Sequence, residues 1–188
     1  MTRIICLGDS NTWGYDPRGF GGGRYPAAVR WVDRLGEAGF FVHNLGENGR
    51  AIPCTRGALD LLCRELDALH PFDGICILLG ANDLLCGAAP EDAAARMAVL
   101  LDRLRRYDAK LLVIAPPRFC LGEWVQDDAL VARSAQLVDK LHTTAAGAAF
   151  ADADAWGISL CYDGVHFSEE GHARFAENML PVWRDVFG

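Results

Sequence analysis

Three side chains of this sequence, Ser10, Asp163 and His166, form a combination that can carry out nucleophilic chemistry. A serine hydroxyl attacks a carbonyl carbon when a neutral imidazole accepts its proton and a carboxylate orients that imidazole. An imidazole is mostly neutral near pH 7 because its unperturbed pKa is about 6.5. Asp163 precedes His166 by three residues, so one turn can bring its carboxylate to the second ring nitrogen. These residues therefore predict a nucleophile, its base and the group that orients the base.

Acyl transfer also needs N–H donors for the negative oxygen that develops on the attacked carbonyl. Gly49 can present its backbone N–H without a side chain in the way. Asn82 carries a side-chain amide that donates two hydrogen bonds. Ser10 lies at a turn between a strand and a helix, which exposes its own backbone N–H. The three residues are therefore candidates for the oxyanion donors.

Short apolar runs alternate with longer helical patterns along the chain, which is typical of strands and crossover helices in a parallel sheet. Strands are predicted at residues 3–7, 40–45, 74–79, 110–115 and 148–151. Helices are predicted from Pro26 to the stop at Gly39, and at residues 56–69, 91–107, 126–146 and 168–186. Right-handed crossovers then give an α/β fold, a three-layer α/β/α sandwich with a five-stranded parallel sheet. No linker or repeat divides residues 1–188, so a single domain is expected.

The candidate residues follow predicted strands or lie near the end of the chain. Ser10 follows the first strand, Gly49 the second and Asn82 the third, while Asp163 and His166 precede the last helix. Ligands of open parallel sheets bind beyond the carboxyl ends of the strands. We therefore expect these segments to meet at one edge of the sheet.

The motifs Gly8-Asp9-Ser10, Gly49, Gly80-Ala81-Asn82-Asp83 and Asp163-Gly164-Val165-His166 occur in this order over nearly the whole chain. Together they resemble the conserved blocks of the SGNH/GDSL hydrolase superfamily. The resemblance implies a flavodoxin-like α/β/α fold, with Ser10 as nucleophile and with His166 and Asp163 as the rest of a catalytic triad. It also implies an oxyanion hole formed by Ser10, Gly49 and Asn82.

A closer resemblance is to the arylesterase- and acyltransferase-like subgroup. It is carried by Gly8-Asp9-Ser10-Asn11-Thr12-Trp13-Gly14, by Arg30-Trp31 and by Asp163-Gly164-Val165-His166-Phe167. Some members of that subgroup act on short acyl esters and pass the acyl group to alcohols. The insertions that build an oligomer interface in such relatives are missing from this short chain. A homo-oligomer is therefore possible but does not follow from the resemblance.

These observations predict a serine-dependent carboxylic-ester hydrolase for short, acetyl-type acyl groups, with a small-molecule ester as its partner and without a cofactor or metal. The alternatives within the fold are a carbohydrate O-acetyl esterase and an acyltransferase. A non-catalytic ligand-binding domain would be expected to lack one of the motifs, and none is lost. A flavodoxin-like nucleotide binder is disfavoured because Asp9 would face the phosphate.

Several further residues are open to two interpretations. Trp13 either lines the substrate pocket or packs over the first helix, and Arg50 either binds substrate or forms a surface ion pair. The loop 119–124 is a candidate for the pocket wall. The glycine-rich segment 18–25 is either a mobile lid or a connector. Asp9 and Asp83 are interpreted as loop-fixing residues, and the remaining histidines, His43, His70, His142 and His172, as structural or solvent-facing.

Composition narrows the function classes further. The formal net charge is -7, which argues against nucleic-acid binding because basic side chains form no cluster. No apolar run reaches the roughly 20 residues that cross a bilayer, and no signal peptide begins the sequence, so no membrane association and a cytoplasmic location are expected. The seven cysteines show no C-x-x-C spacing, which favours reduced structural thiols.

Overall fold

The computed structural model describes residues 1–19 and 23–188. Five parallel strands form one sheet in the order β2-β1-β3-β4-β5. The strands are β1 (Arg3–Gly8), β2 (Phe41–Gly46), β3 (Gly74–Leu78), β4 (Lys110–Ala115) and β5 (Ala149–Asp152). The helices are α1 (Ser10–Trp13), α2 (Trp31–Glu37), α3 (Arg56–Leu69), α4 (Ala81–Leu85), α5 (Pro90–Leu104), α6 (Asp128–Thr144), the 3₁₀ turn η1 (Ala153–Trp156) and α7 (Glu169–Phe187). The predicted fold class is confirmed.

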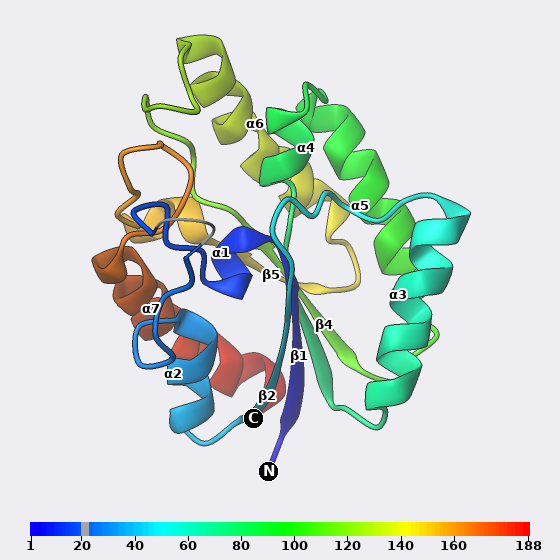
Figure 1. Ribbon diagram of the computed structural model, residues 1–188. Helices are drawn as coiled ribbons and strands as arrows, with labels where there is room; N and C mark the ends of the chain where they lie inside the picture. Colours follow the sequence, from blue (N-terminus) through cyan, green and yellow to red (C-terminus); the bar gives the residue numbers. More distant parts are fainter. Residues whose placement is uncertain (20–22) are drawn as a thin grey trace.

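The sheet separates two hydrophobic cores because successive side chains of a strand point to opposite faces. Ile4 and Cys6 of β1 pack into the core that α2 and α7 cover, whose largest members include Trp31 and Trp183. Ile5 and Leu7 face the other core, which α3, α4, α5 and α6 cover. Figure 1 shows α2 and α7 on one side of the sheet and α3 and α5 on the other. Because helices cover both faces of the sheet, ligands can reach it only at the amino or the carboxyl ends of its strands.

The helices begin where the sequence supplies capping residues. Thr55 precedes α3 and its hydroxyl accepts a hydrogen bond from the N–H of Ala58 at 3.3 Å. Ser168 precedes α7 and accepts from the N–H of Gly171 at 3.0 Å. Both caps satisfy N–H groups that have no partner within the helix. The predicted bounds of α3 and β4 agree with the structure, and those of the other strands differ by one residue at one or both ends.

The helix predicted from Pro26 is wrong at its start, because α2 begins at Trp31. Pro26 instead opens a turn, in which its carbonyl accepts a hydrogen bond from the N–H of Val29 at 2.9 Å. Arg30 is extended, with φ -65° and ψ 131°, and the helix begins after it. Proline fixes φ near -65°, a value that turns and first helical positions share, so the residue alone does not distinguish them.

The end of β2 is packed closely against α1. A Cβ atom on Gly46 would lie 2.2 Å from the backbone nitrogen of Trp13, so only glycine allows this approach. The contact holds the short helix that begins at Ser10 against the carboxyl end of the sheet. Both termini lie at the opposite edge of the sheet (Figure 1). Among the helices that the structure describes, none is both long enough and apolar enough to cross a membrane.

Candidate active site

The structure brings Ser10, His166 and Asp163 into one chain of hydrogen bonds. Ser10 Oγ lies 2.9 Å from His166 Nε2, and His166 Nδ1 lies 2.7 Å from Asp163 Oδ2. All three side chains are buried, with residue exposures of 7%, 2% and 1% respectively. A hydroxyl beside an imidazole whose other nitrogen binds a carboxylate is the arrangement that nucleophilic acyl transfer requires.

The loop that carries His166 also fixes the ionisation of Asp163. Asp163 Oδ1 accepts hydrogen bonds from the backbone N–H groups of Val165 at 2.9 Å and His166 at 3.0 Å. Burial by itself raises the pKa of Asp163, but the ring and backbone hydrogen bonds outweigh it and hold the pKa below its ordinary value. Asp163 is therefore a carboxylate at neutral pH, and it binds the Nδ1 side of the imidazole.

Asp9 lies next to Ser10 but makes a different contact. Its carboxylate accepts a hydrogen bond from the N–H of Asn11 at 2.9 Å and caps α1. Asp9 is 2% exposed, and burial raises its pKa from 3.8 to about 6, although Asn11 and His166 partly oppose the shift. Its contact with the turn backbone agrees with the structural role expected from the sequence.

The candidate oxyanion donors lie on two loops beside Ser10. Gly49 has φ +77°, a left-handed conformation that glycine adopts without strain. Within the described part of the chain, the Gly49 N–H donates no hydrogen bond. Asn82 Nδ2 donates to the carbonyl oxygen of Arg50 at 3.1 Å, which fixes the plane of its amide. Within the described residues, this amide donates no second hydrogen bond, so its other N–H is a candidate donor to a ligand.

A cavity of about 240 Å³ joins these groups. Its lining residues are Ser10, Tyr15, Asn48, Gly49, Asn82, Trp124 and His166. The nucleophile, the base and both candidate donor residues beyond Ser10 therefore face one space. Trp124 belongs to the loop 119–124 that the sequence suggested as a pocket wall.

The rings of Tyr15 and Trp124 both lie close to the His166 ring. The ring centroids are 4.6 Å apart for Tyr15, tilted by 57°, and 4.9 Å apart for Trp124, nearly edge-on at 81°. Tyr15 and Asn48 were not predicted from the sequence to line the site. Tyr15 follows Gly14, whose φ of +92° turns the chain back toward the site. An aromatic residue directly after a glycine at the end of the nucleophile turn is the signal that could have identified it.

Trp13 and Arg50 are not among the described residues that line this cavity, and both make other contacts. The Arg24 guanidinium lies 4.8 Å from the Trp13 ring centroid, and Arg24 Nε donates to the Trp13 carbonyl at 2.7 Å. Arg50 forms an ion pair with Glu47 at 2.6 Å and also binds the carbonyl of Leu45. The Arg50 side chain therefore stabilises the end of β2 and the loop that follows it.

The segment 18–25 is anchored at its described positions. Arg18 binds Asp16 at 2.9 Å and Glu169 at 2.7 Å, and Tyr25 is 2% exposed. Residues 20–22 of this segment lie outside the described residues. The choice between a lid and a connector therefore stays a prediction.

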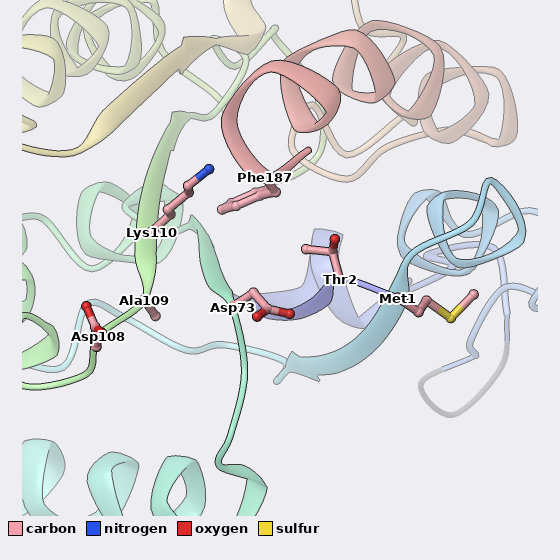
Figure 2. A pocket seen from close by; sticks show the side chains of 7 residues that line it. All are labelled: Met1, Thr2, Asp73, Asp108, Ala109, Lys110 and Phe187. Carbon is pink, nitrogen blue, oxygen red and sulfur yellow. The ribbon is translucent and has the colours of Figure 1, made fainter.

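A larger cavity of about 650 Å³ lies at the opposite edge of the sheet, by the amino ends of the strands (Figure 2). Its lining residues are Met1, Thr2, Asp73, Asp108, Ala109, Lys110 and Phe187. Asp73 Oδ2 accepts a hydrogen bond from the backbone N–H of Arg3 at 2.7 Å, which gives this carboxylate a structural partner. No serine or histidine lines this cavity within the described part of the chain, so the smaller one carries the chemistry argued above.

A three-layer sandwich with a serine, a histidine and an aspartate joined at the carboxyl edge of its sheet defines a class of acyl-transferring hydrolases. The profile of the GDSL-like lipase/acylhydrolase family matches residues 6–174. The chain belongs to this family, and it is a carboxylic-ester hydrolase.

Solved structures support the same assignment. The chain is similar to the aryl esterase of M. smegmatis, with 25% sequence identity and a TM-score of 0.87, over 99% of this chain and 100% of that chain. It is also similar to a carbohydrate acetylesterase family member from Sinorhizobium meliloti, with 27% identity and a TM-score of 0.86, over 100% of both chains. A comparison with curated proteins gave no match.

Proposed function

We propose that the protein hydrolyses short-chain, acetyl-type esters through an acyl-enzyme on Ser10. The observation that carries this proposal is the 2.9 Å contact between Ser10 Oγ and His166 Nε2 at the wall of the 240 Å³ cavity. The distance is within the range in which a base removes a proton from a hydroxyl. A domain that only binds a ligand would not need this contact between Ser10 and His166, so the contact also argues against such a domain.

The proposed reaction has two halves. Ser10 Oγ attacks the ester carbonyl carbon while His166 Nε2 takes the hydroxyl proton. The carbonyl oxygen becomes negative and accepts hydrogen bonds from the N–H groups of Ser10 and Gly49 and from the Asn82 amide. The bond to the alcohol oxygen then breaks, and His166 returns its proton to that oxygen. The alcohol leaves, and the acyl group stays on Ser10 as an ester.

Water completes the reaction by the same steps. His166 takes a proton from water, whose oxygen attacks the acyl carbon, and the same donors hold the second oxyanion. The bond to Ser10 Oγ breaks and His166 returns the proton to it, which releases a carboxylic acid. Asp163 keeps the Nδ1 proton in place and stabilises the imidazolium in both halves.

The size of the cavity supports a short acyl group. About 240 Å³ lies below the roughly 300–1,000 Å³ of sites that enclose drug-sized ligands. The acyl group must lie beside the donors of Gly49 and Asn82, whereas the alcohol must lie within reach of His166. Tyr15 and Trp124 both lie close to His166, so a flat alcohol would contact aromatic rings on leaving. This supports aryl esters, the class that the name of the M. smegmatis relative gives.

The experiment compares wild type and Ser10→Ala on p-nitrophenyl acetate, followed by the butyrate and octanoate esters. If the turnover rate of Ser10→Ala is several orders of magnitude below that of wild type, the serine mechanism is supported. A preference for octanoate would overturn the short-acyl proposal. Release of acetate from an acetylated sugar, or transfer of the acyl group to an added alcohol, would favour the two alternatives.

A further inference from the structure

The side chain of Asn11 connects the residue after Ser10 to the loop that carries His166. Its Nδ2 donates to the carbonyl oxygen of Val165 at 3.2 Å, and its Oδ1 accepts from the backbone N–H of Phe167 at 2.8 Å. One amide group therefore binds the backbone on both sides of His166. These contacts span more than 150 positions of sequence, so they are made by the tertiary fold and not by a local turn.

Asn11 is itself held in place. Its side chain is buried, with a residue exposure of 5%. Its backbone N–H donates to Asp9 at 2.9 Å, and its backbone carbonyl accepts from Trp31 Nε1 at 3.0 Å. Trp31 is 1% exposed, and its ring centroid lies 4.8 Å from that of Phe175 in the core between the sheet and α7. The position of Asn11 is thus fixed by one of the two hydrophobic cores.

We propose that Asn11 is a positioning residue that aligns His166 Nε2 with Ser10 Oγ, an inference that rests on the proposed function. Because Ser10 and Asn11 are adjacent in the chain, a shift of residues 165–167 relative to Asn11 is also a shift of His166 relative to Ser10. Asp163 contacts the ring and sets its tautomer and rotation. Asp163 also binds the backbone N–H groups of Val165 and His166, but it belongs to the same loop. Asn11 binds that loop from a distant part of the chain and ties it to the residue after Ser10.

The effect of losing this alignment follows from geometry. A base must lie within hydrogen-bond reach of the proton that it removes, and a displacement of 1 Å can cost about 100-fold in rate. The cavity lining does not include Asn11, so substrate binding has no direct contact to lose. A change at Asn11 therefore acts on kcat and leaves KM close to its wild-type value.

The first variant is Asn11→Leu, which has a similar size and removes both side-chain hydrogen bonds. Its kcat on p-nitrophenyl acetate is expected to fall about 10- to 100-fold. The second variant, Asn11→Asp, keeps an acceptor for the Phe167 N–H but cannot donate to the Val165 carbonyl. It is expected to lose less than Asn11→Leu at neutral pH, and it serves as the test if Asn11→Leu does not fold.

Asn44→Leu is the matched control. Asn44 Nδ2 donates to the Thr12 carbonyl at 2.8 Å and its Oδ1 accepts from the Gly46 N–H at 2.8 Å. The variant therefore removes the same two kinds of hydrogen bond beside the same short helix, without touching residues 165–167. Its Tm is expected to fall as far as that of Asn11→Leu, with a smaller loss of kcat. An equal loss of kcat in the two variants would overturn the proposal.

A fluorophosphonate probe separates this inference from the proposed function. Its phosphorus is attacked by a nucleophilic serine, fluoride leaves and the serine proton passes to the base. Mass spectrometry of the labelled peptide then gives the site and the rate. The wild type is expected to be labelled at Ser10. In Asn11→Leu the labelling rate is expected to fall by the same factor as kcat, and this result would support the inference.

The remaining outcomes each have one meaning. Wild-type labelling and turnover rates in both folded Asn11 variants would overturn the inference and leave the proposed function intact. Failure of the wild type to react at Ser10, with no turnover that depends on Ser10, would overturn the proposed function and the positioning role with it.

Discussion

The carboxylate of Asp83 accepts a hydrogen bond from the backbone N–H of Ile52 at 2.9 Å, although 31 residues separate the two. Its other oxygen binds Arg96 Nη1 at 2.7 Å, and Asp83 is fully buried. Asn82 directly precedes Asp83, and Gly49 lies three residues before Ile52. The contact therefore holds together the two loops that supply the proposed oxyanion donors.

Replacing Asp83 by alanine should weaken both the fold and the reaction. The variant leaves the buried Ile52 N–H without a partner, which costs about 1–3 kcal/mol in the free energy of unfolding. The kcat on p-nitrophenyl acetate should fall about 10-fold or more because both donors lose their alignment. Asp83→Asn retains an acceptor for Ile52 and should lose less. Urea unfolding and steady-state kinetics measure the two effects, and unchanged kcat in Asp83→Ala would contradict the coupling.

Removing the amide of Asn82 tests its role as an oxyanion donor. Asn82→Ala should lower kcat about 100- to 1,000-fold, the usual cost of losing one such donor. Asn82→Asp should be at least as slow, because it places a negative charge beside the oxyanion. KM should change little in the alanine variant, since the donor acts mainly in the transition state. A loss confined to KM would mean that Asn82 binds the ground state only.

Asp163 and Asp9 should behave differently when each becomes asparagine. Asp163→Asn favours the wrong tautomer of His166, so kcat should fall about 1,000- to 10,000-fold. Asp9→Asn keeps an acceptor for the Asn11 N–H and leaves the contact between His166 and Asp163 in place. Its loss of kcat should be much smaller. Steady-state rates at pH 8 provide the comparison. A larger loss of kcat for Asp9→Asn than for Asp163→Asn would mean that Asp163 is not the carboxylate that orients His166.

The free energy of unfolding should depend on pH through the protonation of His172. This side chain is fully buried, and its ring nitrogens have no hydrogen-bond partner within the described residues. Burial, helped by Arg34 and Arg30, lowers the pKa of His172 to about 3. The unfolded chain gains the proton near pH 6.5 and the native protein only near pH 3. Stability therefore falls as pH decreases through this window, by up to about 1.4 kcal/mol per pH unit from this group.

His172→Leu should remove that component, so its Tm should fall less steeply than the wild-type Tm between pH 6.5 and pH 4. His142→Gln is the control, because His142 is exposed and stacks on Phe150 at 4.7 Å between ring centroids. Its Tm profile should run parallel to that of wild type. Thermal unfolding at several pH values measures the slopes, and equal slopes for His172→Leu and wild type would refute the assignment.

Asp9 should change the stability in the opposite direction from His172, so that its contribution decreases as pH rises. Because its pKa rises from 3.8 to about 6 on folding, the native protein binds more protons than the unfolded chain between these values. Its contribution to stability is present below pH 3.8 and is lost as pH rises through 6. Asp9→Asn stays neutral, so its Tm should gain on the wild-type Tm from pH 4 to pH 7. A constant difference across this range would contradict the shifted pKa.

Much of the fold was predictable because its signals are local. The buried strands of the sheet are continuous apolar runs, and the stripe of Leu59, Leu62 and Leu66 identifies α3. The start of α2 was missed because a proline fits a turn as well as a helix. The short helix α4 was also missed, since Ala81–Leu85 is too short to show a full helical period.

The candidate site was predictable where residue type and sequence order carry the chemistry, as for Ser10 and His166. Tyr15 and the amide contacts of Asn11 were not, because they depend on how distant loops pack. A contact of Trp13 or Arg50 with substrate stays a prediction. The single-domain organisation, the cytoplasmic location, a homo-oligomer and the lack of nucleic-acid or membrane partners stay predictions.

The two hydrophobic cores have separate consequences for catalysis. In the proposed positioning role, Asn11 aligns Ser10 with His166 and is itself held by Trp31, in the core beneath α2 and α7. The alignment of Asn82 with Gly49 depends on Ile52 and Asp83, beside the core beneath α3 to α6. The two arrangements meet at Ser10, whose hydroxyl faces His166 and whose N–H is a candidate oxyanion donor, and at Val165, which packs in the second core. A substitution in either layer is therefore expected to reach the reaction by its own route, through Trp31 and Asn11 on one side of the sheet and through Ile52 and Asp83 on the other.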